Sequence, residues 1–269
     1  MPYGSILAKF KKVRLSTADG KHYDMEMNLI NRLGAKIVGI PHLGFRHRAR
    51  LIFKMINNLA LPENARILDA GCGYGIYSFM LAEKKFNVDS LDILGERISA
   101  IKERIREHQP YSKRIRPQQG SLINIPYNDN YFDLIICSDV IEHMKEDLVA
   151  VNELARVLAP GGHLILTTPT NSKECQKTYK SFDHERPGYT DVDYQNFAKS
   201  NGLVIKKISH FEFKIGSSLF HLIQSIDNKV LLGLIFYPVY IISLIDIVLR
   251  IGEPNGVVCL LKKPDLGEI

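Results

Sequence analysis

The segment from Ile67 to Tyr77 limits the fold of this chain more than any other stretch. It reads Ile-Leu-Asp-Ala-Gly-Cys-Gly-Tyr-Gly-Ile-Tyr, so that an apolar run meets three glycines and a helix-like apolar segment follows. A strand, a glycine-rich turn and a helix in this order are typical of the first unit of a nucleotide-binding α/β sheet. The glycine spacing and the acid at position 69 then indicate which nucleotide fits.

Strand and helix patterns alternate along the rest of the chain, which predicts a parallel sheet with helices on both faces. The runs Leu134 to Cys137 and Leu164 to Leu166 are continuously apolar, as strands buried on both faces are. The predicted strands cover residues 66–69, 88–92, 114–118, 132–138, 163–168, 203–213 and 256–263. The predicted helices cover residues 46–59, 75–84, 95–108, 145–158 and 190–201, and a polar loop is expected over 171–189.

The length of 269 residues suits one large α/β domain with additions. We expect an N-terminal accessory helical segment (1–60), a core domain (61–215), an apolar helical insertion (216–255), and the last strand of the core with a tail (256–269). Thr190 and Asp193 stand three apart, which predicts a capping box at the start of the last core helix.

Charge and cysteine content narrow the function only modestly. The 35 basic and 29 acidic side chains give a net charge of +6, which permits an anionic partner without requiring one. The four cysteines form no C-x-x-C pair, which suits a reducing cytoplasm. The nine histidines show no metal-ligand spacing, so we predict no metal site. The first apolar run is too short for a signal peptide, and we expect a cytoplasmic protein.

The glycine turn argues against a dinucleotide. The fingerprint G-x-G-x-x-G requires a third glycine where Ile76 stands, and no G-K-[ST] motif follows. The carboxylate of Asp69 would repel a pyrophosphate in this turn by on the order of several kcal/mol. It would favour a cationic ligand without phosphate, such as S-adenosylmethionine. Asp92 closes the second predicted strand, where a carboxylate can accept hydrogen bonds from both ribose hydroxyls.

Further motifs follow the glycine turn in a fixed order. They are Leu91-Asp92-Ile93, Ile125-Pro126-Tyr127, Phe132-Asp133-Leu134-Ile135, Ile141-Glu142-His143 and Leu158-Ala159-Pro160-Gly161-Gly162-His163-Leu164. With them the sequence resembles the class I S-adenosylmethionine-dependent methyltransferases, and among these the group that contains the ubiquinone- and menaquinone-biosynthesis enzymes. The resemblance covers about residues 60–210 and the last strand. It implies a doubly wound, seven-stranded Rossmann-like sheet whose last strand is antiparallel, with S-adenosylmethionine as cofactor.

The resemblance also implies roles for single residues. Asp69 and the backbone of Gly71 and Gly73 would hold the methionine moiety, Asp92 the ribose, and Ile93 would pack on the adenine. The family usually has an aspartate where this chain has Ser121, so the contact with the adenine amino group departs from the pattern there. The full predicted cofactor set is Asp69, Gly71, Cys72, Gly73, Gly75, Asp92, Ile93, Ser121, Leu122 and Ser138, the last lying near the reacting methyl.

Methyl transfer is an in-line displacement in which the protein mainly positions the acceptor, and a general base assists. His143 is the first candidate for the base, because it follows the fourth strand at the carboxyl edge, where doubly wound sheets bind ligands. His184, after the fifth strand, is the second. Two alternatives stay open: Glu142 and His143 could cap the next helix, and His184 could belong to a solvated loop.

The residues after the fourth strand limit the acceptor. Ser138-Asp139-Val140-Ile141 replaces the Pro-Pro-aromatic tetrad of amino-group DNA methylases, Ile136 precedes Cys137 where cytosine-carbon methylases have proline, and no paired-glutamate loop of arginine methylases is present. We therefore expect a small-molecule or lipid acceptor, such as a quinone precursor or an isoprenoid, and no nucleic acid. The alternatives are a catalytically silent cofactor-binding or membrane-docking protein, and an RNA methyltransferase, which the basic charge would suit.

Residues 230–245 form 16 consecutive positions without a charge, bounded by Lys229 and Asp246 and interrupted by Pro238. A membrane span needs about 20 residues, and the last strand must return to the same sheet, so we reject a simple transmembrane helix. Two interpretations stay open. The helices form a lid or a homodimer contact, or residues 216–250 lie on the inner face of a membrane and admit an apolar substrate, with arginines such as Arg46 and Arg48 at the headgroups.

Overall fold

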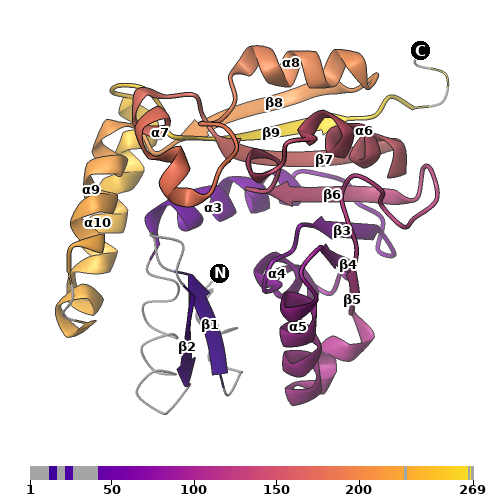
Figure 1. Cartoon of the computed structure of the whole chain (residues 1–269), viewed down its shortest axis with the longest axis horizontal. Helices are drawn as coiled ribbons and strands as arrows, with labels where there is room; N and C mark the ends of the chain where they lie inside the picture. The colour runs from indigo at the N-terminus through magenta and orange to yellow at the C-terminus, as the bar shows by residue number, and fades with distance from the viewer. Residues whose placement is uncertain (1–11, 17–21, 27–41, 227–228, 266, 268–269) are drawn as a thin grey trace. The chain divides into compact units, whose positions relative to one another are not determined.

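The computed structural model describes residues 12–16, 22–26, 42–226, 229–265 and 267, and a seven-stranded sheet organises them (Figure 1). The strand order is β5-β4-β3-β6-β7-β9-β8. The strands are β3 (Arg66–Ala70), β4 (Asn87–Asp92), β5 (Ile115–Gln119), β6 (Phe132–Ser138), β7 (Leu158–Pro169), β8 (Val204–Phe211) and β9 (Gly256–Lys262). Strands β3 to β7 pair in parallel, and β9 runs opposite to its neighbours. The predicted fold class is confirmed.

The helices follow the predicted alternation closely. They are α3 (Leu43–Asn57), α4 (Ile76–Glu83), α5 (Gly95–Glu107), α6 (Asp147–Val157), α7 (Lys173–Thr178), α8 (Asp191–Ser200), α9 (Lys214–Gln224) and α10 (Lys229–Leu249). Short 3₁₀ turns cover η1 (Gln109–Lys113), η2 (Ile141–His143) and η3 (Tyr179–Phe182). The predicted capping box is confirmed: the Thr190 hydroxyl accepts a hydrogen bond from the Asp193 N–H at 3.3 Å, and the Asp193 carboxylate accepts one from the Thr190 N–H at 2.7 Å.

The prediction that a strand starts at residue 163 is wrong. Helix α6 ends at Val157, and β7 begins at the next residue. Phe132 of β6 pairs with Leu158, whereas Leu134 pairs with His163, so the Pro-Gly-Gly segment is an irregularity within the strand. Gly161 has a φ of +75° and donates its N–H to the Lys263 carbonyl at 2.9 Å. Glycine serves here to turn the strand locally rather than to terminate it.

Two other segments differ from their predictions. The expected loop over 171–189 contains α7 and η3. The Ser172 hydroxyl accepts a hydrogen bond from the Cys175 N–H at 3.2 Å, which caps the first turn of α7. The N-terminal segment, predicted to be helical, has α3 but also a short antiparallel pair of strands, β1 (Lys12–Ser16) and β2 (His22–Glu26).

The chain divides into two compact units. The first comprises Met1–Lys54, Pro169–Gly188 and Ser209–Val257, and the second comprises Met55–Thr168, Tyr189–Ile208 and Val258–Ile269. The second unit holds most of the sheet, and residues 134–137 of β6 are completely buried, as expected for a strand covered on both faces. The boundaries at residues 60, 215 and 255 stay a prediction.

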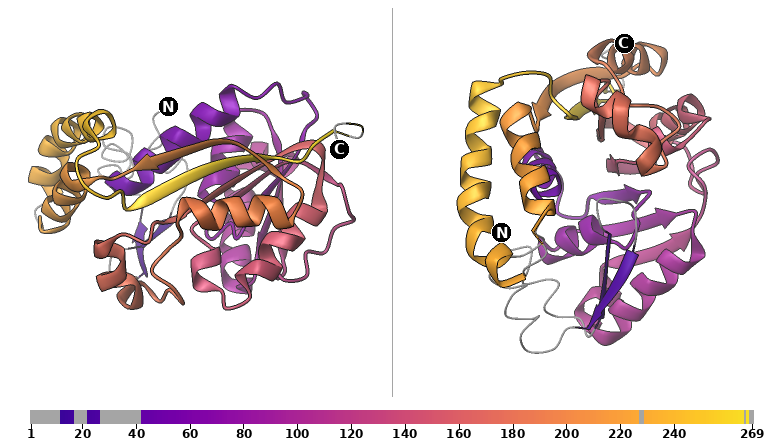
Figure 2. Two further views of the ribbon diagram at one scale, coloured as in Figure 1. Left: turned by 90° about the horizontal axis from the view of Figure 1, so that it is seen from above. Right: turned by 60° about the vertical axis from the view of Figure 1, so that its left-hand side comes forward.

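The first unit contains the predicted apolar insertion, in which α9 and α10 lie side by side (Figure 2). Its core consists of Leu43, Ile223, Phe236 and Val239. Arg46, expected at lipid headgroups, is buried instead, because its guanidinium lies 4.6 Å from the centre of the Phe236 ring. Among the helices of the described residues, none combines the length and the apolarity needed to cross a bilayer.

Candidate functional site

The glycine turn between β3 and α4 has a backbone that only glycines adopt readily. Gly71, Gly73 and Gly75 have φ values of +71°, +55° and +79°. A Cβ atom on Gly71 would lie 2.5 Å from a methyl carbon of Val140, so this glycine permits close packing after β6. A Cβ atom on Gly73 would meet nothing within 4 Å. Gly73 therefore keeps open space beside the turn, which is what a bound ligand requires.

The turn is tied to the neighbouring strand by its own N–H groups. Gly71 and Cys72 donate to the Leu91 carbonyl at 2.8 and 2.9 Å, and Gly73 donates to Oδ2 of Asp92 at 2.9 Å. These N–H groups are thus already bonded within the protein. What the glycines offer a ligand is close approach to the backbone. Burial raises the pKa of the Cys72 thiol well above its ordinary value, so Cys72 is an uncharged residue of the turn.

Asp92 occupies the carboxyl end of β4, next to the turn. The residue is 3% exposed; Oδ1 accepts the Leu94 N–H at 2.9 Å, and Arg97 lies 3.4 Å from Oδ2. A carboxylate has about four acceptor positions, and the contacts with Gly73, Leu94 and Arg97 fill three of them, so Oδ1 can accept one further hydrogen bond. This arrangement suits a hydroxyl such as that of a ribose.

Asp69 is a buried carboxylate at the carboxyl end of β3. Its Oδ2 accepts the Ser78 N–H at 2.9 Å and the Ser78 hydroxyl at 2.5 Å, and that hydroxyl lies 2.7 Å from the Ser90 hydroxyl. Burial raises the pKa of Asp69 to about 6, the hydrogen bonds from Ser78 oppose this rise, and the charge of Asp92 adds to it. A cation nearby would stabilise the ionised form.

Sequence reasoning missed Ser78 and Ser90. Both are almost completely buried, one in α4 and one in β4. A lone serine inside an apolar run was the signal that could have found Ser78, because a buried hydroxyl needs a partner, whereas Ser90 follows Asp89 in a mixed segment and gave no such signal.

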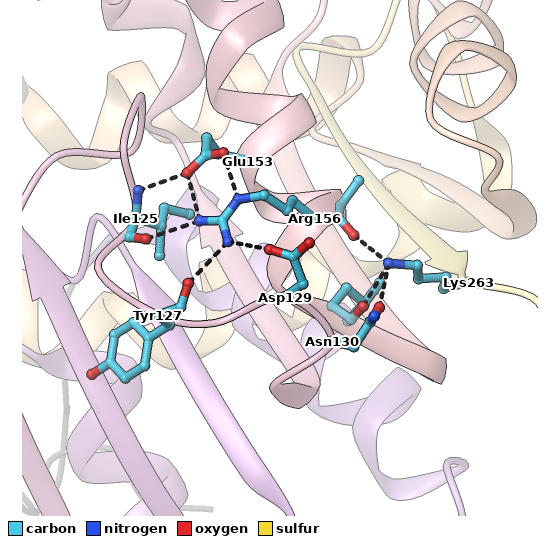
Figure 3. Close-up of polar contacts among 9 residues, drawn as sticks. Ile125, Tyr127, Asp129, Asn130, Glu153, Arg156 and Lys263 are labelled. Carbon is cyan, nitrogen blue, oxygen red and sulfur yellow. Dashed lines mark hydrogen bonds and ion pairs between the residues drawn. The ribbon is translucent and has the colours of Figure 1, made fainter.

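The residues after β5 include Ser121 and Leu122 of the predicted set. The Ser121 hydroxyl accepts the Ile123 N–H at 3.3 Å, and Leu122 is buried. The segment that follows is fixed by Arg156 of α6 (Figure 3). Its guanidinium donates to the carbonyls of Ile125 and Tyr127, both at 2.9 Å, and forms ion pairs, both at 2.7 Å, with Glu153 and Asp129. Arg156 therefore holds the connection between β5 and β6 against α6.

Ser138 ends β6 in a short chain of hydrogen bonds. Its hydroxyl lies 3.0 Å from that of Thr167, which donates to Oδ1 of Asp139 at 3.0 Å. Asp139 has a φ of +53°, a conformation that costs a non-glycine residue about 1 kcal/mol or more and occurs often at functional sites. Sequence reasoning did not anticipate this strained residue.

His143 lies in the η2 turn directly after β6, and its side chain is exposed. The turn is fixed by Tyr189, whose hydroxyl lies 3.1 Å from the Ile141 carbonyl and 2.8 Å from Oδ2 of Asp147. Helix α6 begins four residues further on, with Glu146 at its N-cap, so His143 is not the capping residue. His184, after η3, belongs to the first unit, whereas His143 belongs to the second.

The second unit thus brings the predicted cofactor residues to the carboxyl ends of four adjacent strands, β3 to β6. The same edge exposes large apolar side chains after β4, β5 and β6. They are Ile93 (63% exposed), Leu94, Ile123, Leu148 and Val149. Two buried carboxylates, an open glycine turn and an apolar rim can hold a cationic nucleoside and an apolar second substrate.

Comparisons with known proteins agree with this geometry. The family described as "Methyltransferase domain" matches residues 68–166. A ubiquinone biosynthesis O-methyltransferase from Rickettsia akari (strain Hartford) is 30% identical over 169 residues, 62% of this chain and 61% of that protein. A demethylmenaquinone methyltransferase from Lactiplantibacillus plantarum is 28% identical over 108 residues, 39% of this chain and 45% of that protein. The chain spans between 35% and 62% of the length of the curated relatives it matches.

Among solved structures, a geranyl diphosphate C-methyltransferase from Streptomyces coelicolor A3(2) has the same fold. The TM-score is 0.62 at 16% identity, over 80% of this chain and 77% of that one. Over residues 68–166 the chain matches the methyltransferase domain family, and its fold and site are similar to those of class I S-adenosylmethionine-dependent methyltransferases, which supports S-adenosylmethionine as the cofactor. The resemblance predicted from the motifs is confirmed, and it rests most firmly on residues 68–166.

Proposed function

We propose that this protein transfers the methyl group of S-adenosylmethionine to a small, apolar or lipid-like acceptor of the quinone or isoprenoid class. The observation that carries the proposal is the open glycine turn between the buried carboxylates of Asp69 and Asp92. The acceptor class is supported by relatives named for ubiquinone and menaquinone biosynthesis. It is also supported by the apolar rim at the carboxyl edge of the second unit.

Every predicted cofactor residue except Cys72 has a role in this proposal. Asp92 accepts a hydrogen bond from the ribose, and Asp69 balances the positive charge of the methionine moiety from its buried position. Gly73 leaves room for the ligand, while Gly71 and Gly75 allow the turn to pack. Ile93 packs on the adenine near Ser121 and Leu122, and Ser138 lines the end of β6.

The bound cofactor supplies a sulfonium-activated methyl group, and the chain's own residues supply position and a base. His143 is exposed at the carboxyl edge and is held on a fixed turn, where it can take the proton of an acceptor hydroxyl or carbon. Leu148 is 59% exposed in the first turn of α6, only five residues further along, which favours an apolar acceptor. His184 is the second candidate for the base.

The experiment uses pairs of acceptors that share one aromatic ring, with and without an isoprenoid tail, and a trideuteromethyl cofactor. We expect mass spectrometry to show the labelled methyl group on the tailed acceptor only. His143→Gln should lower kcat about 10² to 10⁴-fold and leave cofactor affinity unchanged. His108→Gln is the control, because His108 follows α5 at the opposite edge of the sheet.

Three outcomes would count against the proposal. Cofactor binding without any transfer would indicate a catalytically silent protein. Transfer to RNA in place of the tailed acceptor would favour the RNA methyltransferase. Full activity of His143→Gln would assign the base to another residue, with His184→Gln as the next variant to measure.

A further inference from the structure

Helix α10 is apolar on its outer side as well as in its core contacts, and its polar side chains Ser243 and Asp246 face inward. Both residues are completely buried. The opposite side, here called the outer face, consists of Leu231, Leu234, Ile241, Ile242, Ile245 and Val248, which are between 47% and 79% exposed. A helix at a water-exposed surface has the reverse arrangement, with charged residues outward and apolar residues inward.

The buried polar residues of α10 fix this orientation. Oδ1 of Asp246 accepts the Ile215 N–H at 3.2 Å, and Oδ2 accepts the Gly216 N–H at 2.8 Å. The carboxylate thereby satisfies the first turn of α9, where a negative charge is favourable. The Ser243 hydroxyl lies 2.8 Å from Nε2 of His47 in α3. Rotating α10 to hide its outer face would break all three contacts and expose the core residue Phe236.

The composition of the outer face indicates what covers it. A protein–protein interface carries about one hydrogen bond per 100–200 Å² and a polar rim. The six outer-face side chains have no polar atom, and Tyr237, which lies beside them and is 38% exposed, adds a single hydroxyl. The six extend over roughly 26 Å of helix, from residue 231 to 248 at about 1.5 Å per residue. Lipid hydrocarbon neither donates nor accepts hydrogen bonds, so this face fits lipid acyl chains better than a protein surface.

Basic residues lie at one end of this face. Lys214 and Arg250 are both exposed, and the Lys214 N–H donates to the Ile251 carbonyl at 3.0 Å, which places the start of α9 beside the end of α10. The one acidic residue within α10, Asp246, is turned inward. Glu253, three residues after Arg250, is also exposed, and its carboxylate accepts the Lys173 N–H at 2.9 Å. The two cations outnumber this acid, and positive charge at the edge of an apolar face is complementary to anionic headgroups.

We propose that the outer face of α10 inserts into the acyl region of an anionic bilayer surface, with the helix along the membrane plane and Lys214 and Arg250 at the headgroups. The inference deepens the proposed function, because the role of the outer face in capturing an apolar acceptor rests on that function. Membrane binding by the outer face does not rest on it, so membrane binding and methyl transfer can fail separately.

The first test measures flotation of the full chain with vesicles of phosphatidylcholine, with and without phosphatidylglycerol. We expect the wild type to bind the anionic vesicles more strongly, and Ile241→Asn/Ile245→Asn to lower the partition coefficient about 100-fold, roughly tenfold for each half-exposed side chain. Val192→Asn/Val204→Asn is the matched control. These two residues, on α8 and β8, are 59% and 46% exposed, against 61% and 50% for the isoleucines, and their substitution should leave partitioning unchanged.

The second test adds a reporter instead of removing a contact, so that a folding defect cannot imitate the result. The chain contains no tryptophan. Ile241→Trp therefore introduces a single fluorophore, whose emission should shift to the blue with anionic vesicles and be quenched by brominated acyl chains. Val192→Trp should show neither effect.

Two results would overturn the inference. One is an Ile241→Trp emission that vesicles leave unchanged. The other is a wild-type protein that sediments as a dimer, a double variant Ile241→Asn/Ile245→Asn that sediments as a monomer, and no vesicle binding by either. The outer face would then be the contact with a second copy of the chain. Vesicle binding without methyl transfer would support the inference and count against the proposed function. The double variant should retain cofactor affinity and transfer to a detergent-solubilised acceptor.

Discussion

Replacing Asp69 by asparagine should make the cofactor-free protein more stable and bind its cofactor less well. The carboxylate is 2% exposed, and its pKa in the folded protein is about 6, above the ordinary value of 3.8. A raised pKa means that the stability associated with the protonated group is fully present below pH 3.8 and is lost as the pH rises through 6. At pH 7.5 the folded protein therefore holds a charge that the unfolded chain would carry more easily.

The magnitude follows from the difference between the two pKa values. About two pKa units at 1.36 kcal/mol each give roughly 3 kcal/mol lost at pH 7.5. Asparagine is uncharged, and its carbonyl can still accept hydrogen bonds from Ser78. We expect Asp69→Asn to raise the free energy of unfolding of the cofactor-free protein by up to about 3 kcal/mol. A rise in Tm of about 2–4 °C per kcal/mol should accompany it. Cofactor affinity should fall about 10- to 100-fold, since an opposite charge nearby is lost.

The assay is thermal unfolding of cofactor-free protein at pH 4 and pH 7.5, with calorimetric titration of S-adenosylmethionine at pH 7.5. The two proteins should be nearly equally stable at pH 4 and differ at pH 7.5. Asp89→Asn is the control, because Asp89 is also buried on a strand but binds Arg116 through two contacts of 2.8 Å. That variant should lose stability and keep cofactor affinity.

The result that refutes the reasoning is a less stable Asp69→Asn protein at pH 7.5. It would mean that the carboxylate is a net stabilising cap of α4 through Ser78. An unchanged affinity would remove Asp69 from the cofactor site, whatever its effect on stability.

Two further predictions concern one residue of the turn and one of the first unit. Gly73→Ala and Gly202→Ala both place a side chain at a positive φ (+55° and +62°) with open space around it. Each substitution should cost about 1 kcal/mol of stability. Only Gly73→Ala should weaken cofactor binding, tenfold or more by titration calorimetry. Equal cofactor affinities of the two variants would mean that the ligand does not use the space beside Gly73. Burial, with a smaller effect of Arg50, lowers the pKa of His47 to about 4 from 6.5. The neutral His47 contributes roughly 3 kcal/mol to the free energy of unfolding above pH 6.5, and this contribution is lost as the pH falls towards 4. Denaturant titrations between pH 6.5 and 4 should therefore show a smaller loss of stability for His47→Gln than for the wild type. Equal losses of stability for the two proteins would contradict the assignment.

The cofactor side of the molecule could be predicted because its determinants are local in sequence. Three glycines at positive φ and carboxylates at the ends of two strands follow from spacing alone. Where a determinant is distant, prediction failed. The irregularity in β7 depends on Lys263, about a hundred residues further on, and the strain at Asp139 depends on its hydrogen bond with Thr167.

The orientation of α10 shows most clearly why pattern alone is insufficient. Ser243 and Asp246 stand three apart and so share one side of a helix, which by the usual rule should be the side that faces water. Their partners are His47 in α3 and the N–H groups that open α9, 196 and 30 residues away in sequence. A polar residue thus faces inward when a fixed partner replaces water, and apolar side chains are left on the opposite side of the helix.

Asp246 and Asp69 are alike in one respect, since each is a buried carboxylate that accepts N–H groups from the first turn of a helix. They differ in their surroundings. Asp69 lies in a site with a second buried carboxylate, Asp92, beside a turn where Gly73 keeps space open. Asp246 has Gly216 packed against it so closely that a Cβ there would lie 2.6 Å from its Oδ2. Both carboxylates are therefore enclosed by the protein, but Asp69 also has a second carboxylate close enough to raise its pKa, and that pair is the arrangement that favours a cationic ligand.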